Sequence, residues 1–342
     1  MIEKRDFGKT SEYGEPVQVY TITAGDYRLS VSTLGGTILS LETPDAQGKR
    51  ENIVLGLPSV QDYEKSTTYM GSLIGRFANR IKAGKFSIDG HAYQVPCNDH
   101  GVNALHGGPE GLNTKLWNVL TSEVDGAPAL HLSCISDDGE MGFPGRLKVH
   151  VDYILFPSGK LEITYAAVCD KTTPVNLTNH AYFNLAGSGD VLDHELQLYC
   201  NAYLPVDDEL IPTGEVRSVV DTPFDFTAGK PIGKDLEEAG GYDHCMVLTD
   251  TGDHLKPCAY VRDPKSGRTM KVSTTMVGVQ FYSGNFLDGS DVSPAGTPYG
   301  KHAGFCLETQ QYPDAMNHDN FPNSLLRPGE TYKHTTLLEF NV

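Results

Sequence analysis

RLKVHVDYILFPSGKLEITYAA, residues 146–167, is the stretch of sequence that decides the fold. Apolar and polar residues alternate from Arg146 to Leu155, and they alternate again from Lys160 to Ala167. Because successive side chains of a β-strand point to opposite faces, each half predicts a strand with one buried face. The FPSG between them supplies a turn, so the two halves predict an antiparallel hairpin.

The same alternation recurs along most of the chain and predicts further strands at 17–23, 129–134, 260–262, 270–274 and 331–340. Helical patterns are few, and residues 59–65 and 233–239 each predict only a short turn or two of helix. The 36 glycines and 20 prolines fall at strand-length intervals, which is typical of a large antiparallel β-sandwich. The chain of 342 residues has no linker, repeat or low-complexity tract. We therefore predict an all-β protein with a single domain over residues 1–342.

The composition argues against several classes of partner. The formal net charge of −17, from 27 basic and 44 acidic residues, repels nucleic-acid phosphates and anionic lipid surfaces. The seven cysteines are scattered and include no CxxC pair, so neither a disulfide framework nor a zinc finger is expected. No segment resembles a signal peptide, and no apolar run reaches a membrane-spanning length. We expect a soluble cytoplasmic protein that binds neither nucleic acid nor membranes.

The segment TPVNLTNHAYFNLAG, residues 173–187, sets one titratable side chain, His180, among amides and apolar residues. Asn176, Asn179 and Asn184 can each donate and accept hydrogen bonds, and a neutral ligand rich in hydroxyls would suit them. Alternatively, the segment is a strand and turn whose asparagines only satisfy backbone groups. The segment alone leaves both interpretations open.

Two further segments carry side chains suited to proton transfer. In ALHGG, residues 104–108, His106 precedes two glycines that allow the backbone to approach a ligand closely. In GFCLETQ, residues 304–310, Glu308 ends an apolar run, so we expect its carboxylate to be partly desolvated. A histidine and a carboxylate are the usual pair for general acid–base chemistry.

GRFANRI, residues 75–81, adds Arg76, Asn79 and Arg80 within one turn. Together these segments resemble the signature blocks of the aldose 1-epimerase, or galactose mutarotase, family. The similarity runs nearly end to end, in the family's order and spacing, through NIVLG (52–56), DGEMGFPG (138–145), YLPVDDELIPTG (203–214), GYDH (241–244), GVQFYSGNFLDG (278–289) and RPGETY (327–332). The resemblance implies one large β-sandwich with its site in a cleft on one sheet.

The resemblance also implies an enzyme that interconverts the α and β anomers of free hexoses such as galactose and glucose. Opening and reclosing a sugar ring moves protons only, so general acid–base catalysis suffices and no cofactor is expected. Carried over from the family, the base falls on Glu308 and the acid on His180, with His106 as a second donor. The family's sugar-binding positions fall on Asn79, Arg80, Asp243 and Gln280. Spacing alone leaves these four unassigned, because an arginine beside an aspartate is often a structural ion pair.

The same residues also suggest three other functions: a zinc enzyme, a glycosidase and a sugar-binding module. His106, His180 and Glu308 also match the ligand types of a catalytic zinc site, but their wide spacing lacks the short helical pairs such sites often use, so no metal is expected. A glycosidase needs two carboxylates beside the scissile bond, whereas here Glu308 qualifies and Asp243 is the only candidate for the second. A non-catalytic sugar-binding module would need no paired acid and base.

Hexose 6-phosphate epimerases share the fold of this family, so the fold does not decide whether the substrate is neutral or phosphorylated. A phosphate pocket would use clustered basic residues, whereas LHGG, NLTNHAYFNLAG and LETQ match the branch that acts on neutral sugars. Met141, Phe143 and Tyr312 depart from the family's common pattern. These departures concern the sugar preference, which stays open together with the oligomeric state.

Overall fold

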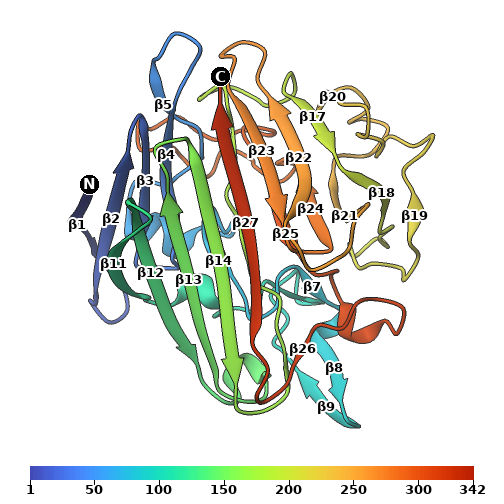
Figure 1. Cartoon of the computed structure of the whole chain (residues 1–342). Helices are drawn as coiled ribbons and strands as arrows, with labels where there is room; N and C mark the ends of the chain where they lie inside the picture. The colour runs from blue at the N-terminus through green and yellow to red at the C-terminus, as the bar shows by residue number, and fades with distance from the viewer.

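The structure is a computed structural model that describes residues 1–342, and its sheets are built entirely from antiparallel strand pairs (Figure 1). The largest sheet has nine strands in the order β11 (Asn118–Val124), β12 (Ala127–Ser136), β13 (Leu147–Leu155), β14 (Lys160–Cys169), β27 (Tyr332–Asn341), β23 (Thr269–Thr274), β22 (Lys256–Arg262), β17 (Glu195–Leu198) and β20 (Lys230–Pro231). A five-stranded sheet runs β1 (Ile2–Lys9), β2 (Pro16–Ala24), β3 (Tyr27–Ser32), β4 (Ile38–Pro44) and β5 (Arg50–Asn52). A second five-stranded sheet, which we call the site sheet, runs β19 (Arg217–Ser218), β18 (Cys200–Tyr203), β21 (Asp243–Leu248), β24 (Gly278–Tyr282) and β25 (Cys306–Gln310).

Short elements connect these sheets. Four two-stranded ladders pair β6 (Leu73–Ile74) with β16 (Thr178–Asn179), β7 (Arg80–Ile81) with β10 (Ala104–Leu105), β8 (Lys85–Ile88) with β9 (His91–Gln94), and β15 (Thr173–Pro174) with β26 (Leu325–Leu326). The helices are α1 (Val60–Lys65) and the 3₁₀ turns Lys82–Gly84, Leu112–Thr114, Glu140–Gly142 and Ala315–Asn317. None of these helices has the length and apolar character that crossing a membrane requires.

The predicted hairpin is confirmed as β13 and β14, with Leu155 opposite Leu161 beside the turn. In β13 the apolar positions are buried and the alternating polar ones are exposed or partly exposed, as the sequence pattern requires. The other predicted strands are confirmed within β2, β12, β22, β23 and β27. Strand prediction succeeds here because one face of each strand packs against the core.

The two predicted helical segments differ in outcome. The first is confirmed as α1, which begins after Ser59, whose side chain accepts the backbone N–H of Asp62. The second, at 233–239, is wrong: residues 232–240 form consecutive turns. This segment starts at a glycine and ends at Gly240 and Gly241, whose φ angles of 69° and 90° lie outside the helical region.

One hydrophobic cluster of 52 buried residues draws on all three large sheets. The site sheet contributes Val279, Phe281 and Leu307 to it. These findings confirm the all-β antiparallel sandwich. A shared core of this size supports the expected single domain over residues 1–342, which stays a prediction.

The site sheet has two different faces. Phe281 and Leu307 point into the central core, so alternation sends their neighbours Gln280 and Glu308 to the opposite face. Gln280 lies directly opposite Glu308 across β24 and β25. Asp243 lies on the same face of the next strand, β21, opposite Tyr282. The pleat of this sheet therefore gathers three predicted site residues from distant parts of the chain.

Candidate active site

Glu308 lies in the middle of β25, not at the end of the strand as its sequence context predicted. All five residues of β25 are buried, and the Glu308 side chain is only 2% exposed. Its Oε2 atom is buried and has no hydrogen-bond partner. An ionisable group in this position is costly to leave unpaired, and such groups mark functional sites.

The two histidines reach this carboxylate from short ladders. His180 directly follows β16, where its backbone N–H donates to Ser72 and its carbonyl accepts from Gly71, both at 2.9 Å. His106 directly follows β10 and adopts a left-handed φ of 54°. Gly107 follows with a φ of 94°, and a Cβ there would lie 2.1 Å from the carbonyl oxygen of Gly75, so the turn itself requires a glycine.

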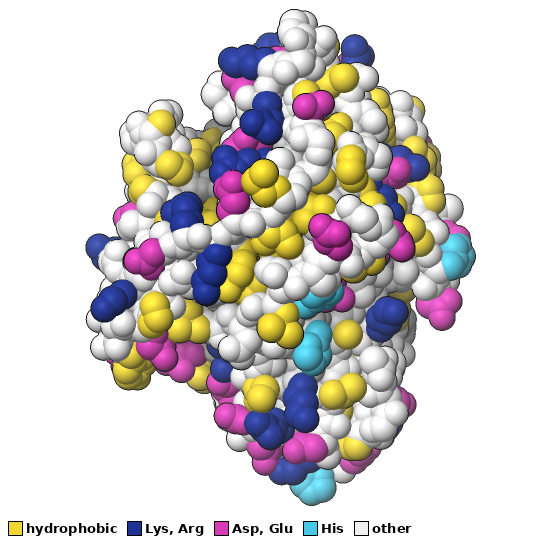
Figure 2. Space-filling model, turned by 60° about the vertical axis from the view of Figure 1, so that its left-hand side comes forward, with side chains coloured by type: hydrophobic (Ala, Val, Ile, Leu, Met, Phe, Trp, Pro, Cys, Tyr) yellow, Lys and Arg dark blue, Asp and Glu magenta, His cyan; other side chains and the backbone are white.

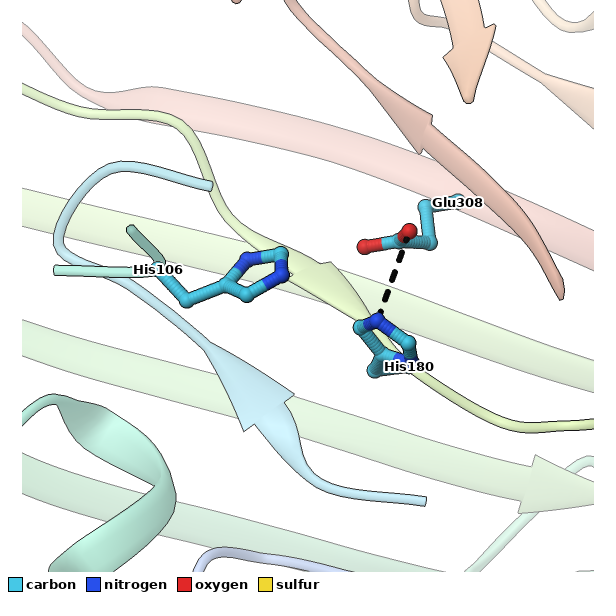
Figure 3. Close-up of side chains that lie close together, drawn as sticks. All are labelled: His106, His180 and Glu308. Carbon is cyan, nitrogen blue, oxygen red and sulfur yellow. Dashed lines mark ion pairs between the residues drawn. The ribbon is translucent and has the colours of Figure 1, made fainter. Parts of the chain in front are cut away.

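The three side chains that the family resemblance singles out lie together (Figure 3). His180 Nε2 lies 3.7 Å from Glu308 Oε1. The rings of His106 and His180 are 5.2 Å apart and nearly perpendicular, at 82°. One ligand atom from each of the three side chains lies within 4.8 Å of the other two. The arrangement gathers one carboxylate and two imidazoles, which are side chains of the kinds that general acid–base chemistry uses, around one small space.

The predicted sugar-binding residues adjoin this group. Gln280 Nε2 donates to Asp243 Oδ1 at 2.7 Å, which leaves the buried Gln280 Oε1 without a partner. Arg80 Nη1 lies 3.9 Å from Asp243 Oδ2, while its Nε donates to Asp99 at 2.7 Å. The sequence analysis missed Asp99, since nothing in the segment CNDHG, residues 97–101, indicates that Asp99 pairs with Arg80.

Asn79 connects His106 and Arg80 through two hydrogen bonds. Its side-chain Oδ1 accepts the backbone N–H of Arg80 at 2.8 Å, and its own backbone N–H donates to His106 Nδ1 at 3.1 Å. The second bond fixes the state of the imidazole, because a nitrogen that accepts an N–H carries no proton. Neutral His106 therefore holds its proton on Nε2.

Burial sets the titration of the three central groups. It holds the pKa of Glu308 well above the ordinary carboxyl value; the charge of Asp243 adds to the shift and Arg80 opposes it. Burial lowers the pKa of His180 to about 4, although hydrogen bonding to the backbone of the same residue acts in the opposite direction. Burial, with the neighbouring His180 and Arg80, also holds the pKa of His106 well below the usual imidazole value.

Comparison with known proteins places the chain. A model of the aldose 1-epimerase family matches residues 18–339. The galactose mutarotase of Rattus norvegicus is 44% identical over 98% of this chain and 97% of its own length. The aldose 1-epimerase of Escherichia coli (strain K12) is 39% identical, over 96% of each chain. The chain belongs to the aldose 1-epimerase family.

Solved structures of this family agree with the fold. An aldose epimerase homologue from C. elegans superimposes with a TM-score of 0.87 at 33% identity, over 94% of this chain and 98% of that one. The galactose 1-epimerase from Lactobacillus acidophilus NCFM gives a TM-score of 0.86 at 27% identity, over 100% and 99%. The predicted family, fold and enzyme class are confirmed: the chain is a carbohydrate isomerase that interconverts anomers.

The amides around His180 have a structural role in this member of the family. Asn176 bonds the backbone of Ala78 and Gln311, Asn179 bonds Gly71 and Ala181, and Asn184 bonds Ala186, Gly189 and Ala303. Their donors and acceptors are thus occupied by backbone groups. The alternative interpretation of the segment 173–187 is correct for its asparagines, and His180 is the residue of this segment that faces the site.

The donor set fits a metal ion poorly. A histidine that binds metal through one nitrogen normally donates an N–H from the other nitrogen to an acceptor. At His106 the relation is reversed, because Nδ1 faces the backbone N–H of Asn79. Metal at Nε2 would move the ring proton to Nδ1, against that N–H. The geometry supports a proton-transfer site better than a zinc site.

Proposed function

We propose that this epimerase interconverts the anomers of free hexoses such as galactose and glucose, with Glu308 as the general base and His180 as the general acid. The observation that carries the proposal is the buried contact of 3.7 Å between His180 Nε2 and Glu308 Oε1. Beside it the second carboxylate oxygen is buried and unpartnered. A sugar hydroxyl is a group that would complete this set.

In the proposed reaction Glu308 removes the proton from the anomeric hydroxyl, and the electron pair forms the aldehyde as the bond from C1 to the ring oxygen breaks. His180 gives its proton to that ring oxygen. The aldehyde turns, the ring closes on its other face, and both protons return. His106, with its proton fixed on Nε2, donates a hydrogen bond on the ring-oxygen side.

Sugar hydroxyls are proposed to bind Asn79, Arg80, Asp243 and Gln280. Support comes from the unused capacity of these side chains. Arg80 donates a hydrogen bond through Nε alone, and Gln280 Oε1 has no partner. A planar guanidinium with free Nη groups can address two hydroxyls at once.

A neutral substrate suits this charge distribution better than a phosphorylated one. Arg80 is the basic side chain that pairs with the acidic groups of the site, and Asp99 and Asp243 already face it. Over the molecular face of Figure 2, Lys and Arg side chains are interspersed with Asp and Glu. A phosphate brought beside Glu308 and Asp243 would meet more negative than positive charge.

The location and other partners are part of the same proposal. We infer a cytoplasmic enzyme that works without a metal or cofactor and binds neither nucleic acid nor membranes. The net charge of −17 supports this inference, and so do the seven cysteines, which are free thiols.

Polarimetry of freshly dissolved α-D-galactose tests the proposal. Purified protein should accelerate mutarotation, and galactose and glucose should show much higher kcat/KM values than their 6-phosphates at one ionic strength. Preference for the 6-phosphates would contradict the assignment of substrate class. No acceleration with any aldose would contradict the reaction.

A further inference from the structure

Cys306 is a buried side chain in the site for which the proposed reaction has no use. It precedes Glu308 by two residues on β25, so strand alternation puts both side chains on the site face. Cys306 Sγ lies 3.6 Å from His180 Nδ1, and Glu308 Oε1 lies 3.7 Å from Nε2 of the same ring. One strand thus presents a thiol to one nitrogen of the imidazole and a carboxylate to the other.

Three other rings with polar atoms surround His180, but none of them is hydrogen-bonded to it. The rings of His106, Tyr69 and Tyr182 surround it at centroid distances of 5.2, 6.1 and 5.1 Å. Each of the three already has its own hydrogen-bond partner: Asn79, Asn98 and Thr68, respectively. Cys306 is therefore the side chain that meets Nδ1 of His180.

A nitrogen that acts as acid and then as base must lose its proton between the two steps. The other nitrogen of the neutral ring then has to keep a proton, and it needs an acceptor to hold it. Burial, with the charges of Glu308 and Asp243, raises the pKa of the Cys306 thiol well above its ordinary value, so it stays neutral. Its sulfur remains a weak acceptor.

The two histidines of the site have opposite surroundings at Nδ1. His106 Nδ1 accepts a backbone N–H from Asn79, which puts the ring proton on Nε2. His180 Nδ1 instead meets the sulfur atom of Cys306. A sulfur atom can accept a hydrogen bond from an N–H at Nδ1, which a backbone N–H cannot do.

We propose that Cys306 is a positioning residue that accepts the Nδ1 proton of His180 and keeps Nε2, which faces Glu308, free to take and give a proton. The proposal deepens the proposed function and rests on it. It also separates the roles of the histidines: His180 exchanges its Nε2 proton, whereas His106 keeps its Nε2 proton as a fixed donor. No bond to sulfur forms or breaks.

Nitrogen-15 NMR of the histidine rings in the full-length wild-type protein tests the proposal without any turnover. Near neutral pH the His180 signals should show a protonated Nδ1 and an unprotonated Nε2, and the His106 signals should show the reverse. Assignment uses the loss of each pair of signals in His180→Asn and His106→Gln. A proton on Nε2 of neutral His180 would overturn the proposal.

Substitutions at Cys306 supply the functional test. Cys306→Ala removes the acceptor, so both His180 tautomers should appear and kcat should fall about tenfold with little change in KM, as for other partners that orient a histidine. Cys306→Ser keeps an acceptor and should retain the wild-type tautomer and most of kcat. Cys258→Ala is the matched control, because Cys258 is 0% exposed in the central core. Its removal should lower the melting temperature and leave the His180 signals unchanged.

The outcomes separate this proposal from the proposed function. Wild-type kcat and His180 signals in Cys306→Ala would overturn the positioning role while leaving the acid–base pair intact. An equal loss of kcat in the serine and alanine variants would also overturn it. If the wild-type protein lacked mutarotase activity, the NMR result on His180 would still decide whether Cys306 sets the tautomer.

Discussion

Arg76 and Arg80 lie four residues apart and are both buried, yet their guanidinium groups are used in opposite ways. All three nitrogens of Arg76 are hydrogen-bonded, to Ser136, Asp137, Pro144 and Thr173, at distances of 2.7 to 3.3 Å. Arg80 forms one hydrogen bond, from Nε to Asp99, and its Nη1 atom lies 3.9 Å from Asp243 Oδ2, which is too far for a second one. Arg76 therefore stabilises the loops that it connects, whereas Arg80 keeps unpaired N–H donors in the site.

The same distinction separates two buried asparagines of the fold from two buried acceptors of the site. Asn176 and Asn184 have their amide donors and acceptors bonded to backbone, whereas Gln280 Oε1 and Glu308 Oε2 are buried without a partner. Folding alone does not favour an unpaired buried acceptor, because its lost hydration is not replaced. At Gln280 and Glu308 this unused capacity lies on one face of the site sheet, beside the free donors of Arg80, where a substrate hydroxyl would satisfy it.

The strongest test of this distinction removes the acid or the base. Glu308→Gln keeps the shape of the side chain but removes the base, and His180→Asn removes the acid but leaves an amide that can bond its neighbours. Each should lower kcat by about 10²-fold to 10⁴-fold with sugar binding changed far less. Polarimetry gives kcat, and circular dichroism checks folding. Because both residues serve one sequence of proton transfers, the double variant should lose much less than the product of the two losses. A folded Glu308→Gln enzyme with wild-type kcat would remove the base assignment.

The two arginines offer a paired substitution. Arg80→Lys keeps the charge but loses the planar fork, so it should lower kcat/KM by about 10-fold to 100-fold through misplaced substrate, with little effect on stability. Arg76→Lys should destabilise the fold by roughly 2–4 kcal/mol, because backbone carbonyls lose their donors. Kinetics and urea unfolding on both variants decide the matter. Equal loss of stability at the two positions would contradict the comparison.

Sequence and structure agree where a local pattern suffices. The alternation in residues 146–167 predicts β13 and β14, because a strand with one buried face repeats every two residues. The family resemblance, not composition, singled out His106, His180 and Glu308, and the fold brings them together. Asp99 and Cys306 were missed because their importance depends on which distant side chain faces them. The turns at 232–240 were mistaken for helix since their residues lack a strong pattern of either kind.

The pH dependence sharpens the contrast between the arginines. Because the pKa of His180 is lowered to about 4 and that of Glu308 is raised, the pair holds one proton over the whole interval between. In that interval the proton rests mainly on Glu308, and the reactive arrangement forms when it moves to His180 Nε2. Below about pH 4 the pair holds two protons and lacks a base, and above the raised pKa of Glu308 it holds none and lacks an acid. The kcat/KM profile should therefore be a broad plateau that falls on both sides. Arg80 opposes the rise in the Glu308 pKa, so Arg80→Gln should move the alkaline limb to higher pH, whereas Arg76→Lys should leave it in place.

The smallest expected effect is that of a chelator. His106, His180 and Glu308 form a set of the residue types that bind metal ions, yet Nε2 of His106, the nitrogen that would ligate, already carries a proton. The bond from Asn79 N–H to His106 Nδ1 keeps a hydrogen on Nε2, so a cation there would have to displace that proton and oppose the N–H across the ring. We therefore expect kcat/KM to be unchanged after exhaustive treatment with EDTA and dialysis. Added Zn²⁺ should not raise the activity of the treated enzyme. Activity lost on chelation and restored by Zn²⁺ would show that the acceptors left unpaired around Glu308 complete a metal site instead of awaiting a sugar hydroxyl.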